Sequence, residues 1–192
     1  QTCVAFFDRV FEIGPVFRAE KHNSTRHLNE YIGLDFEMGF INDMSDVMAM
    51  ETAMLKYVVD YLAENYQKEL KICEAKLPKI TTIPIVTFFE ALDILGKSHN
   101  QFDLDPQDEV KLCEYAKENL GSEFIFVEKF PGLKRPFYAM DSKDDPKLAE
   151  SFDLLFRGLE ITTGGQRIHD LAELEKKMER YNMKPEDVGS YT

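Results

Sequence analysis

The stretch that decides the fold runs from Val10 to Ile41 and reads VFEIGPVFRAEKHNSTRHLNEYIGLDFEMGFI. Two apolar runs, Val10–Phe17 and Tyr31–Ile41, flank a polar segment centred on Lys21–Thr25. Runs rich in Val, Ile, Phe and Tyr around a short polar loop predict two antiparallel strands. The loop and its borders carry arginines and histidines. Because a guanidinium presents a fork of donors that matches phosphate oxygens, the pattern indicates a cradle for a phosphate ester.

A second informative stretch lies near the other end of the chain. Phe152–Gly158 reads as a strand and Leu159–Asp170 as its return and exit. Within the return, Glu160 and Thr163 place a carboxylate and a hydroxyl three positions apart. Such oxygens suit Mg²⁺, which prefers one or two protein ligands together with phosphates and water. The stretch therefore indicates a site for a metal-bound nucleotide.

These two stretches resemble the class II aminoacyl-tRNA synthetases of the aspartyl branch. Arg18-Ala19-Glu20, Arg26-His27-Leu28 and the run from Tyr31 resemble the family's motif 2. Glu160-Ile-Thr-Thr-Gly-Gly-Gln-Arg167 is similar to Glu-Ile-(Ser/Thr)-Ser-Gly-(Ala/Gly)-Gln-Arg. The resemblance covers nearly the whole chain, most densely residues 8–41 and 151–170. It implies an α+β fold, an antiparallel β-sheet of six or more strands flanked by helices.

The resemblance also implies ATP-dependent activation of aspartate and its transfer to tRNA(Asp), with release of AMP. Arg18 matches the catalytic arginine that bridges the α-phosphate and the amino-acid carboxylate. Glu20 matches the acid that meets the adenine amino group or the terminal adenosine of the tRNA. The remaining matches to the ATP-binding part of motif 2 are Ala19, Arg26, His27, Leu28 and Tyr31. Tyr31 stands where the family has a phenylalanine that stacks on adenine, and Arg26 reaches toward the terminal phosphates.

Three residues of the second stretch carry implied ligand roles. Glu160 matches a glutamate that binds Mg²⁺ and, through it, ATP. Thr163 stands in place of the usual serine, with an implied role in binding Mg²⁺ and aspartate, although its extra methyl group crowds the aspartate pocket. Arg167 matches the arginine that pairs with the side-chain carboxylate of aspartate. Asp35 and Glu37 face one side of a strand, either holding cations of the pocket or forming a polar sheet surface.

Five of these residues also have a plain structural interpretation. Arg18 could form a surface salt bridge with Glu20, and Arg167 could pair with Asp170 or Glu160. Tyr31 could be an ordinary core aromatic. His27 could be a loop histidine bonded to the backbone, and Glu160 a carboxylate at a sheet edge.

Composition indicates a soluble globular protein. The 192 residues are 44% hydrophobic and 30% charged, and no apolar run approaches 18 residues, so we expect no membrane partner. Three widely spaced cysteines, Cys3, Cys73 and Cys113, favour reduced thiols and a cytoplasmic location. The net charge of −12 argues against nucleic-acid binding by itself. The cations of the first thirty residues give the chain a local basic region.

The rest of the sequence predicts four helices and a further pair of strands. A helix should begin near Asp43–Ser45 and end near residues 65–67. Thr87 with Glu90 forms a capping box ahead of a helix that Gly96 ends, and Asp105-Pro106 begins another that Gly121 closes. The other expected elements are strands at Phe124–Phe130 and Pro136–Met140 and a helix that Asp170 and Glu173 cap and that ends near Asn182.

Only the second of the family's three motifs is complete here. We therefore expect residues 1–192 to be one partial catalytic domain, with a helical insertion or flanking layer at about residues 66–121. The dimer-forming first motif, the third motif and the anticodon-binding domain are absent from this sequence. By the resemblance the parent enzyme is a homodimer that binds tRNA(Asp), ATP, L-aspartate and Mg²⁺. The 192-residue chain alone is expected to be inactive.

Two other functions remain open. The first is an asparaginyl-tRNA synthetase or an asparagine synthetase derived from one, although Leu34-Asp35-Phe-Glu37 favours the aspartyl branch. The second is a non-catalytic, synthetase-like interaction domain, against which intact Arg18, Glu160 and Arg167 speak. Whether the parent also charges the asparagine tRNA depends on the anticodon domain.

Overall fold

A computed structural model of the chain describes residues 2–21 and 28–189. These residues form two compact units, residues 1–47 and residues 48–192, and each unit is described by itself. The first unit contains the short 3-10 helix η1 (Thr2–Ala5) and the strands β1 (Arg9–Phe17) and β2 (Glu30–Met38). Helix α1 (Met44–Asn65) begins in the first unit and continues through the second.

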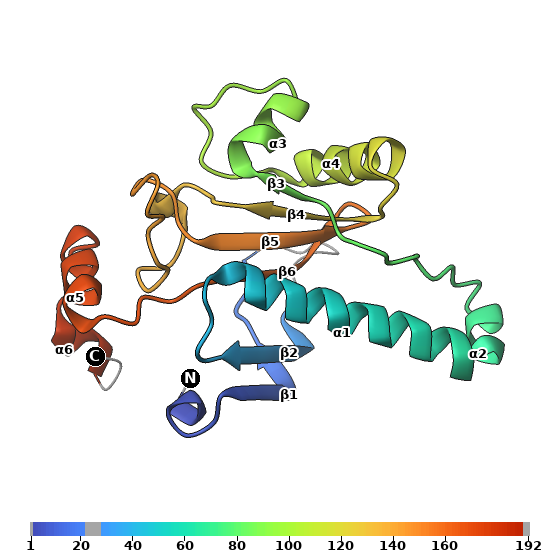
Figure 1. The fold of residues 1–192 in the computed structure, drawn as a ribbon, viewed down its shortest axis with the longest axis horizontal. Helices are drawn as coiled ribbons and strands as arrows, with labels where there is room; N and C mark the ends of the chain where they lie inside the picture. The colour runs from blue at the N-terminus through green and yellow to red at the C-terminus, as the bar shows by residue number, and fades with distance from the viewer. Residues whose placement is uncertain (1, 22–27, 190–192) are drawn as a thin grey trace. The chain divides into compact units, whose positions relative to one another are not determined.

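The second unit contains a four-stranded sheet with helices (Figure 1). Its elements after α1 are α2 (Gln67–Ile72), β3 (Ile85–Thr87), α3 (Phe88–Ile94), α4 (Pro106–Asn119), β4 (Phe124–Glu128), η2 (Gly132–Lys134), β5 (Ser151–Phe156), β6 (Leu159–Gly165), α5 (Leu171–Arg180) and α6 (Pro185–Val188). The strand order is β3-β4-β5-β6. Strands β4, β5 and β6 are antiparallel neighbours.

Strand β3 is parallel to β4, the single parallel pair in the described part of an otherwise antiparallel sheet. A parallel pair needs a long crossover connection, and α3 and α4 supply it. Residues 66–121 therefore include α2, this crossover and one strand of the sheet itself. Among the described residues, no helix is both long and apolar enough to cross a membrane.

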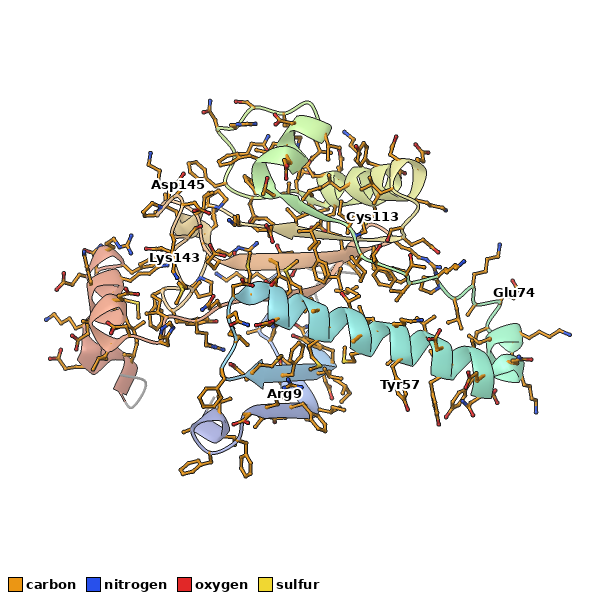
Figure 2. The ribbon with its side chains drawn as sticks, viewed as in Figure 1. Arg9, Tyr57, Glu74, Cys113, Lys143 and Asp145 are labelled. Atoms are coloured by element: carbon orange, nitrogen blue, oxygen red, sulfur yellow. The ribbon has the colours of Figure 1, made fainter. Side chains whose placement is uncertain are left out.

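The core of the second unit lies between α3, α4 and one face of the sheet (Figure 1). Its buried members are Phe88, Ala91, Leu92, Leu112, Cys113, Ala116, Ile125, Val127, Phe130 and Leu155. Figure 2 shows Cys113 on α4 beside the strands. Burial raises the pKa of its thiol, which makes the thiolate scarce and the residue a packing element.

The helix signals of the sequence are confirmed. Thr87 and Glu90 form a reciprocal capping box at α3, and Asp105 caps α4 ahead of Pro106. Gly96 and Gly121, which follow these helices, both have φ +66°. The left-handed backbone that ends a helix is open to glycine at little cost.

Three predicted strands differ from the structure. Strand β2 ends at Met38, because Phe40 has a positive φ of 58° and turns the chain. Strand β4 ends at Glu128 for the same reason, since Lys129 has φ 57°. Residues 136–140 form no strand, because the Ala139 amide bonds to the Pro136 carbonyl in a turn. Only a single bridge then joins Ala139 to Arg167.

Helix α5 is anchored by charged groups. The Lys177 side chain is 2% exposed and donates to the Ala139 carbonyl and to Asp141 Oδ1. Arg180 also pairs with Asp141. Burial would raise the pKa of Asp141, but hydrogen bonds from Lys177 and Arg180 outweigh it and hold the pKa below its ordinary value. The buried ammonium is therefore paired, as a buried charge must be.

The strand junction at Gly165 gives a testable prediction. A Cβ on Gly165 would lie 2.5 Å from the Glu150 carbonyl oxygen and 2.9 Å from the Ser151 Cα. Both atoms are backbone, so Gly165→Ala must push β5 and β6 apart. We expect the free energy of unfolding, measured by urea denaturation, to fall by about 1–3 kcal/mol.

Gly14→Ala is the matched control for this change. Gly14 also lies in a strand, and its nearest neighbour to an added Cβ is Glu12 Oε1 at 3.6 Å. We expect the control to leave stability within about 1 kcal/mol of the original chain. Equal effects of the two substitutions would contradict the packing argument.

Candidate functional site

Arg18 and Tyr31 lie on the same face of the β1–β2 hairpin. Val16 pairs with Tyr31 in the register, and side chains two positions apart on a strand share a face. The Arg18 guanidinium carbon lies 5.8 Å from the centre of the Tyr31 ring. Its Nη1 is 3.9 Å from Glu20 Oε1, a loose ion pair, and the Arg18 side chain is 61% exposed. The guanidinium is therefore accessible to a ligand.

Asn29 closes the base of the loop between the strands. Its carbonyl accepts a hydrogen bond from the Arg18 amide at 2.9 Å, and its Oδ1 accepts one from the Glu20 amide at 3.1 Å. These bonds fix the backbone on which Arg18 and Glu20 stand. Asn29 was not predicted from the sequence, and its position beside a turn, where Asn often bonds to backbone, is the signal for it.

Two other predicted residues of motif 2, Ala19 and Leu28, lie on the surface of the first unit. Ala19 is exposed, and Leu28 is 54% exposed at the end of the loop. Arg26 and His27 lie outside the described residues, so their roles stay predictions.

The Arg18 face of the hairpin also carries carboxylates and two glycines. Asp35 and Glu37 share this face with Tyr31, which agrees with the prediction that they face one side of a strand. Gly14 and Gly33 pair directly across the two strands on the same face. A Cβ on Gly33 would lie 3.0 Å from Val16 Cγ2, 3.6 Å from Asp35 Oδ2 and 3.8 Å from Tyr31 Cε2, so neighbouring side chains already pack against this glycine.

The other face of the hairpin is mainly apolar, although the exposed charged residues Arg9 and Glu30 lie at its ends. Its exposed large apolar side chains are Phe11 (75%), Ile13 (60%), Phe17 (71%), Ile32 (68%) and Leu34 (49%). The two faces of the same strands therefore have different chemistry, one suited to polar ligands and the other to packing.

A β-bulge in β6 places Glu160 and Thr163 on one face of the sheet. In a regular strand, residues three apart point to opposite faces. Here Glu160 pairs with Leu155 and Thr162 pairs with Leu154, so Ile161 is left without a partner. The extra residue shifts the alternation. Thr163 consequently shares the face of Glu160, and Thr162 points to the other face.

Asp153 and Arg135 complete this group. Asp153 pairs with Thr163 in the register, and its carboxylate forms two hydrogen bonds with the Arg135 guanidinium, at 3.0 and 2.6 Å. Arg135 Nη1 also donates to Thr163 Oγ1 at 3.1 Å. The guanidinium lies 3.9 Å from the centre of the Phe130 ring. Thr163 is thus held by a fixed arginine.

Neither Asp153 nor Arg135 was predicted from the sequence. The signal for Asp153 was present: a lone carboxylate within Phe152-Asp-Leu-Leu-Phe must be paired when that strand is buried. No signal in the sequence identified Arg135 as the partner, because 18 positions separate the two residues. In the structure the Arg135 side chain is 13% exposed and the Asp153 side chain is 7% exposed.

Glu160 lies near the start of β6, and Arg167 lies two residues beyond its end at Gly165. Glu160 is exposed, and its amide donates to Glu109 Oε2 on α4 at 3.0 Å. The Arg167 guanidinium carbon lies 4.4 Å from the centre of the Tyr138 ring. This stacking fixes the direction of the half-buried arginine. Among the described residues, no cluster of three or more His, Cys, Asp or Glu could hold a metal ion.

Glu51 of α1 supports β6 from the opposite face. Its side chain is 2% exposed, and it forms a hydrogen bond with the Thr162 side chain. Its Oε2 is buried and has no hydrogen-bond partner within the described part of the chain. Burial raises the pKa of this carboxyl, although the bond from Thr162 opposes the rise.

The comparison with protein families decides the identity of the fold. The model for the class II tRNA synthetases (D, K and N) matches residues 1–192. The chain belongs to this family. The class II catalytic fold, expected from the two motifs, is thereby confirmed in partial form, with an antiparallel-rich sheet and helices.

Curated relatives of the chain include aspartate–tRNA ligases. The chain is 42% identical to an aspartate–tRNA(Asp/Asn) ligase of Deinococcus radiodurans over 202 aligned residues, covering 100% of the chain and 46% of that protein. It is 42% identical to an aspartate–tRNA(Asp) ligase of Pyrococcus abyssi, covering 96% of the chain and 43% of the relative. The chain thus spans less than half the length of these relatives.

Solved structures agree with this relationship. An aspartyl-tRNA synthetase from Entamoeba histolytica matches with a TM-score of 0.91 at 33% identity, covering 97% of this chain and 40% of that one. An asparaginyl-tRNA synthetase from Pyrococcus horikoshii, complexed with asparaginyl-adenylate, matches with a TM-score of 0.86 at 27% identity. It covers 97% of this chain and 44% of that one.

The protonation of Glu51 gives a prediction. A folded-state pKa above the ordinary value stabilises the fold at low pH, and this contribution is lost as pH rises through the folded pKa. Glu51→Gln removes the titration and keeps a neutral side chain. We expect the stability of Glu51→Gln relative to the original chain to increase between pH 5 and pH 8, about the range above the ordinary Glu pKa.

Urea denaturation at several pH values measures this difference. Glu90→Gln is the control with the opposite sign, because hydrogen bonds from the Thr87 backbone and side chain lower the pKa of Glu90. Its loss should cost more stability at high pH than at low pH. A Glu51→Gln difference that does not change with pH would show that the buried carboxyl does not titrate as expected.

Proposed function

We propose that this chain is part of an aspartate–tRNA ligase, which activates aspartate with ATP and transfers it to tRNA(Asp) with release of AMP. The observation that carries the proposal is the bulge at Ile161. It brings Glu160 and Thr163 to one face, next to the Arg135–Asp153 pair, in a chain about two-fifths identical to proteins of that name.

The chemistry requires positioning and charge stabilisation. A carboxylate of the amino acid attacks the α-phosphorus of ATP in line with the leaving pyrophosphate, and neither group needs a protein acid or base near neutral pH. Preorganised cations near the crowded phosphorus then supply most of the rate enhancement, because they stabilise the charge of the transition state. Arg18, exposed on the hairpin, is proposed to bridge the α-phosphate and the amino-acid carboxylate.

The other motif 2 residues are proposed to bind ATP around Arg18. Tyr31, on the same face of the hairpin as Arg18, is proposed to offer its ring to adenine. Glu20, fixed through Asn29, is proposed to meet the adenine amino group or the tRNA end. Ala19 and Leu28 would border the nucleotide, and Arg26 and His27 would contact its phosphates.

Glu160 and Thr163 are proposed to hold Mg²⁺. Their oxygens face the same side of β6, and one carboxylate with one hydroxyl fits an ion that takes its other ligands from phosphates and water. The charge of Arg135 beside Thr163 is balanced by Asp153, which leaves the site compatible with a cation. When bound, Mg²⁺ would neutralise phosphate charge and orient the triphosphate.

Arg167, with Thr163 and Arg18, is proposed to bind aspartate. Stacking on Tyr138 holds the Arg167 guanidinium in one direction, and a fixed fork of donors suits a side-chain carboxylate. The parent protein is proposed to be a cytoplasmic homodimer. Residues 1–192 would form one partial catalytic domain of it, in which about residues 66–121 are an insertion or flanking layer.

Asparagine is the competing substrate, because the asparaginyl-tRNA synthetase structure shares this fold with a TM-score of 0.86. The two possibilities differ in the charge that Arg167 would meet. A carboxylate would pair with the guanidinium, whereas an amide would leave that charge without a counterion.

Binding of aminoacyl-adenylate analogues to the purified chain tests the proposal. Isothermal titration calorimetry with aspartyl- and asparaginyl-sulfamoyl adenosine, in the presence of Mg²⁺, should show tighter binding of the aspartyl analogue. Arg167→Leu should weaken the aspartyl analogue by about 100-fold or more, since breaking a buried charge pair costs on the order of 3–5 kcal/mol. It should weaken the asparaginyl analogue much less.

Arg157→Leu is the matched control. Arg157 pairs with Glu123 at the turn between β5 and β6 and has no proposed ligand role. It should bind both analogues as the original chain does. A preference for the asparaginyl analogue would favour the competing substrate, and equal losses in both arginine variants would contradict the role of Arg167.

A further inference from the structure

In the bulged segment Glu160–Thr163 the pairing between β5 and β6 is interrupted at one residue. Ile161 has no partner on β5, and the Glu160 amide donates to the side chain of Glu109. A bulge disrupts the local hydrogen bonds and bends the strand. The direction of the Glu160 side chain therefore depends on contacts around the bulge as well as on its pairing with Leu155.

On the face of Glu160, Arg135 holds the segment through Thr163. Its guanidinium bonds to both oxygens of Asp153 and to Thr163 Oγ1. Arg135 is itself held at both ends, because its guanidinium stacks on Phe130 and its carbonyl accepts a bond from the Tyr181 hydroxyl at 3.0 Å. A lysine could supply the charge but not this set of bonds.

On the opposite face, Glu51 holds the segment through Thr162. The carboxyl is almost fully buried, with Thr162 as its hydrogen-bond partner. Its raised pKa favours the neutral acid, which can bond to a hydroxyl without the cost of a buried charge. The neighbouring residues Thr162 and Thr163 thus form hydrogen bonds on opposite faces of the strand, Thr162 with Glu51 and Thr163 with Arg135.

We propose that Arg135 and Glu51 are positioning residues that clamp the bulged segment Glu160–Thr163 from its two faces and so set the direction of the Glu160 carboxylate. The inference rests on the proposed function, because Glu160 and Thr163 are the residues proposed to hold the metal. Neither clamp residue touches the substrates in this proposal.

Two measurements on the 192-residue chain test the clamp. Amide hydrogen exchange reports whether residues 160–163 open, with β4 as the internal reference. Mn²⁺ with ATP, followed by water-proton relaxation, reports whether a metal is held, and Glu160→Gln defines the signal that depends on Glu160. The variants are Arg135→Lys, Glu51→Leu and Glu51→Gln.

We expect Arg135→Lys and Glu51→Leu to raise exchange at residues 160–163 about tenfold, the change that one lost hydrogen bond produces, while exchange in β4 stays unchanged. Both should weaken Mn²⁺·ATP binding by a similar factor. Glu51→Gln keeps a neutral group that bonds to Thr162, so it should retain the original behaviour. Arg157→Lys, the same change in a surface pair, should also have no effect.

Unchanged exchange at residues 160–163 in both disruptive variants would overturn the clamp. Equal rises in β4 and β6 would overturn it as well, because they would show general loss of stability. If exchange rises but metal affinity does not, the positioning role is wrong. If the original chain gives no relaxation signal that depends on Glu160, the proposed metal site fails, whereas the exchange data still decide the clamp.

Discussion

A carboxylate in the middle of a buried strand is the constraint on which the second unit depends. Asp153 must be paired because a buried, unpaired charge costs several kcal/mol. Arg135 reaches it from the loop after η2. That loop lacks regular structure over residues 135–140 but is tied down by the Tyr181 hydroxyl and by the Lys177 side chain of α5. The Arg135–Asp153 ion pair therefore joins the sheet to the irregular loop, and Lys177 and Tyr181 join that loop to α5 and the residue that follows it.

The same pair explains why the bulge is tolerated. Bulges weaken a sheet unless the unpaired residue and its neighbours find other partners. Here the partners are side chains: Glu109 for the Glu160 amide, Arg135 for Thr163 and Glu51 for Thr162. Gly164 and Gly165, which follow, allow the two strands to approach more closely than any side chain would permit. The segment is irregular in hydrogen bonding but fixed in position.

Much of the fold could be predicted from local signals. The capping residues of α3 and α4 and the hairpin around Lys21–Thr25 involve residues close in sequence, so their physics is visible in a short window. The family followed from two motifs. The ends of β2 and β4 were missed, because the positive φ of Phe40 and Lys129 beyond them depends on the surrounding structure.

The site was only half predictable for a similar reason. Glu160 and Thr163 were identified, but a spacing of three in a strand should have separated them, and nothing local announced the bulge at Ile161. Arg135 and Glu51 act through contacts with residues far along the chain. Such long-range partners are set by tertiary structure, so no pattern within either segment could have indicated them.

The two-faced hairpin has a consequence for the behaviour of the chain in solution. One face presents large side chains such as Phe11 and Phe17 that are more than two-thirds exposed, and surfaces of this kind favour self-association. The chain also carries a net charge of −12, which makes molecules repel one another. Ionic strength should decide the balance, since salt screens the repulsion but strengthens apolar contact. The alternation of apolar and polar side chains along a nine-residue strand thus affects the solubility of the chain and the range of buffers in which it stays dispersed.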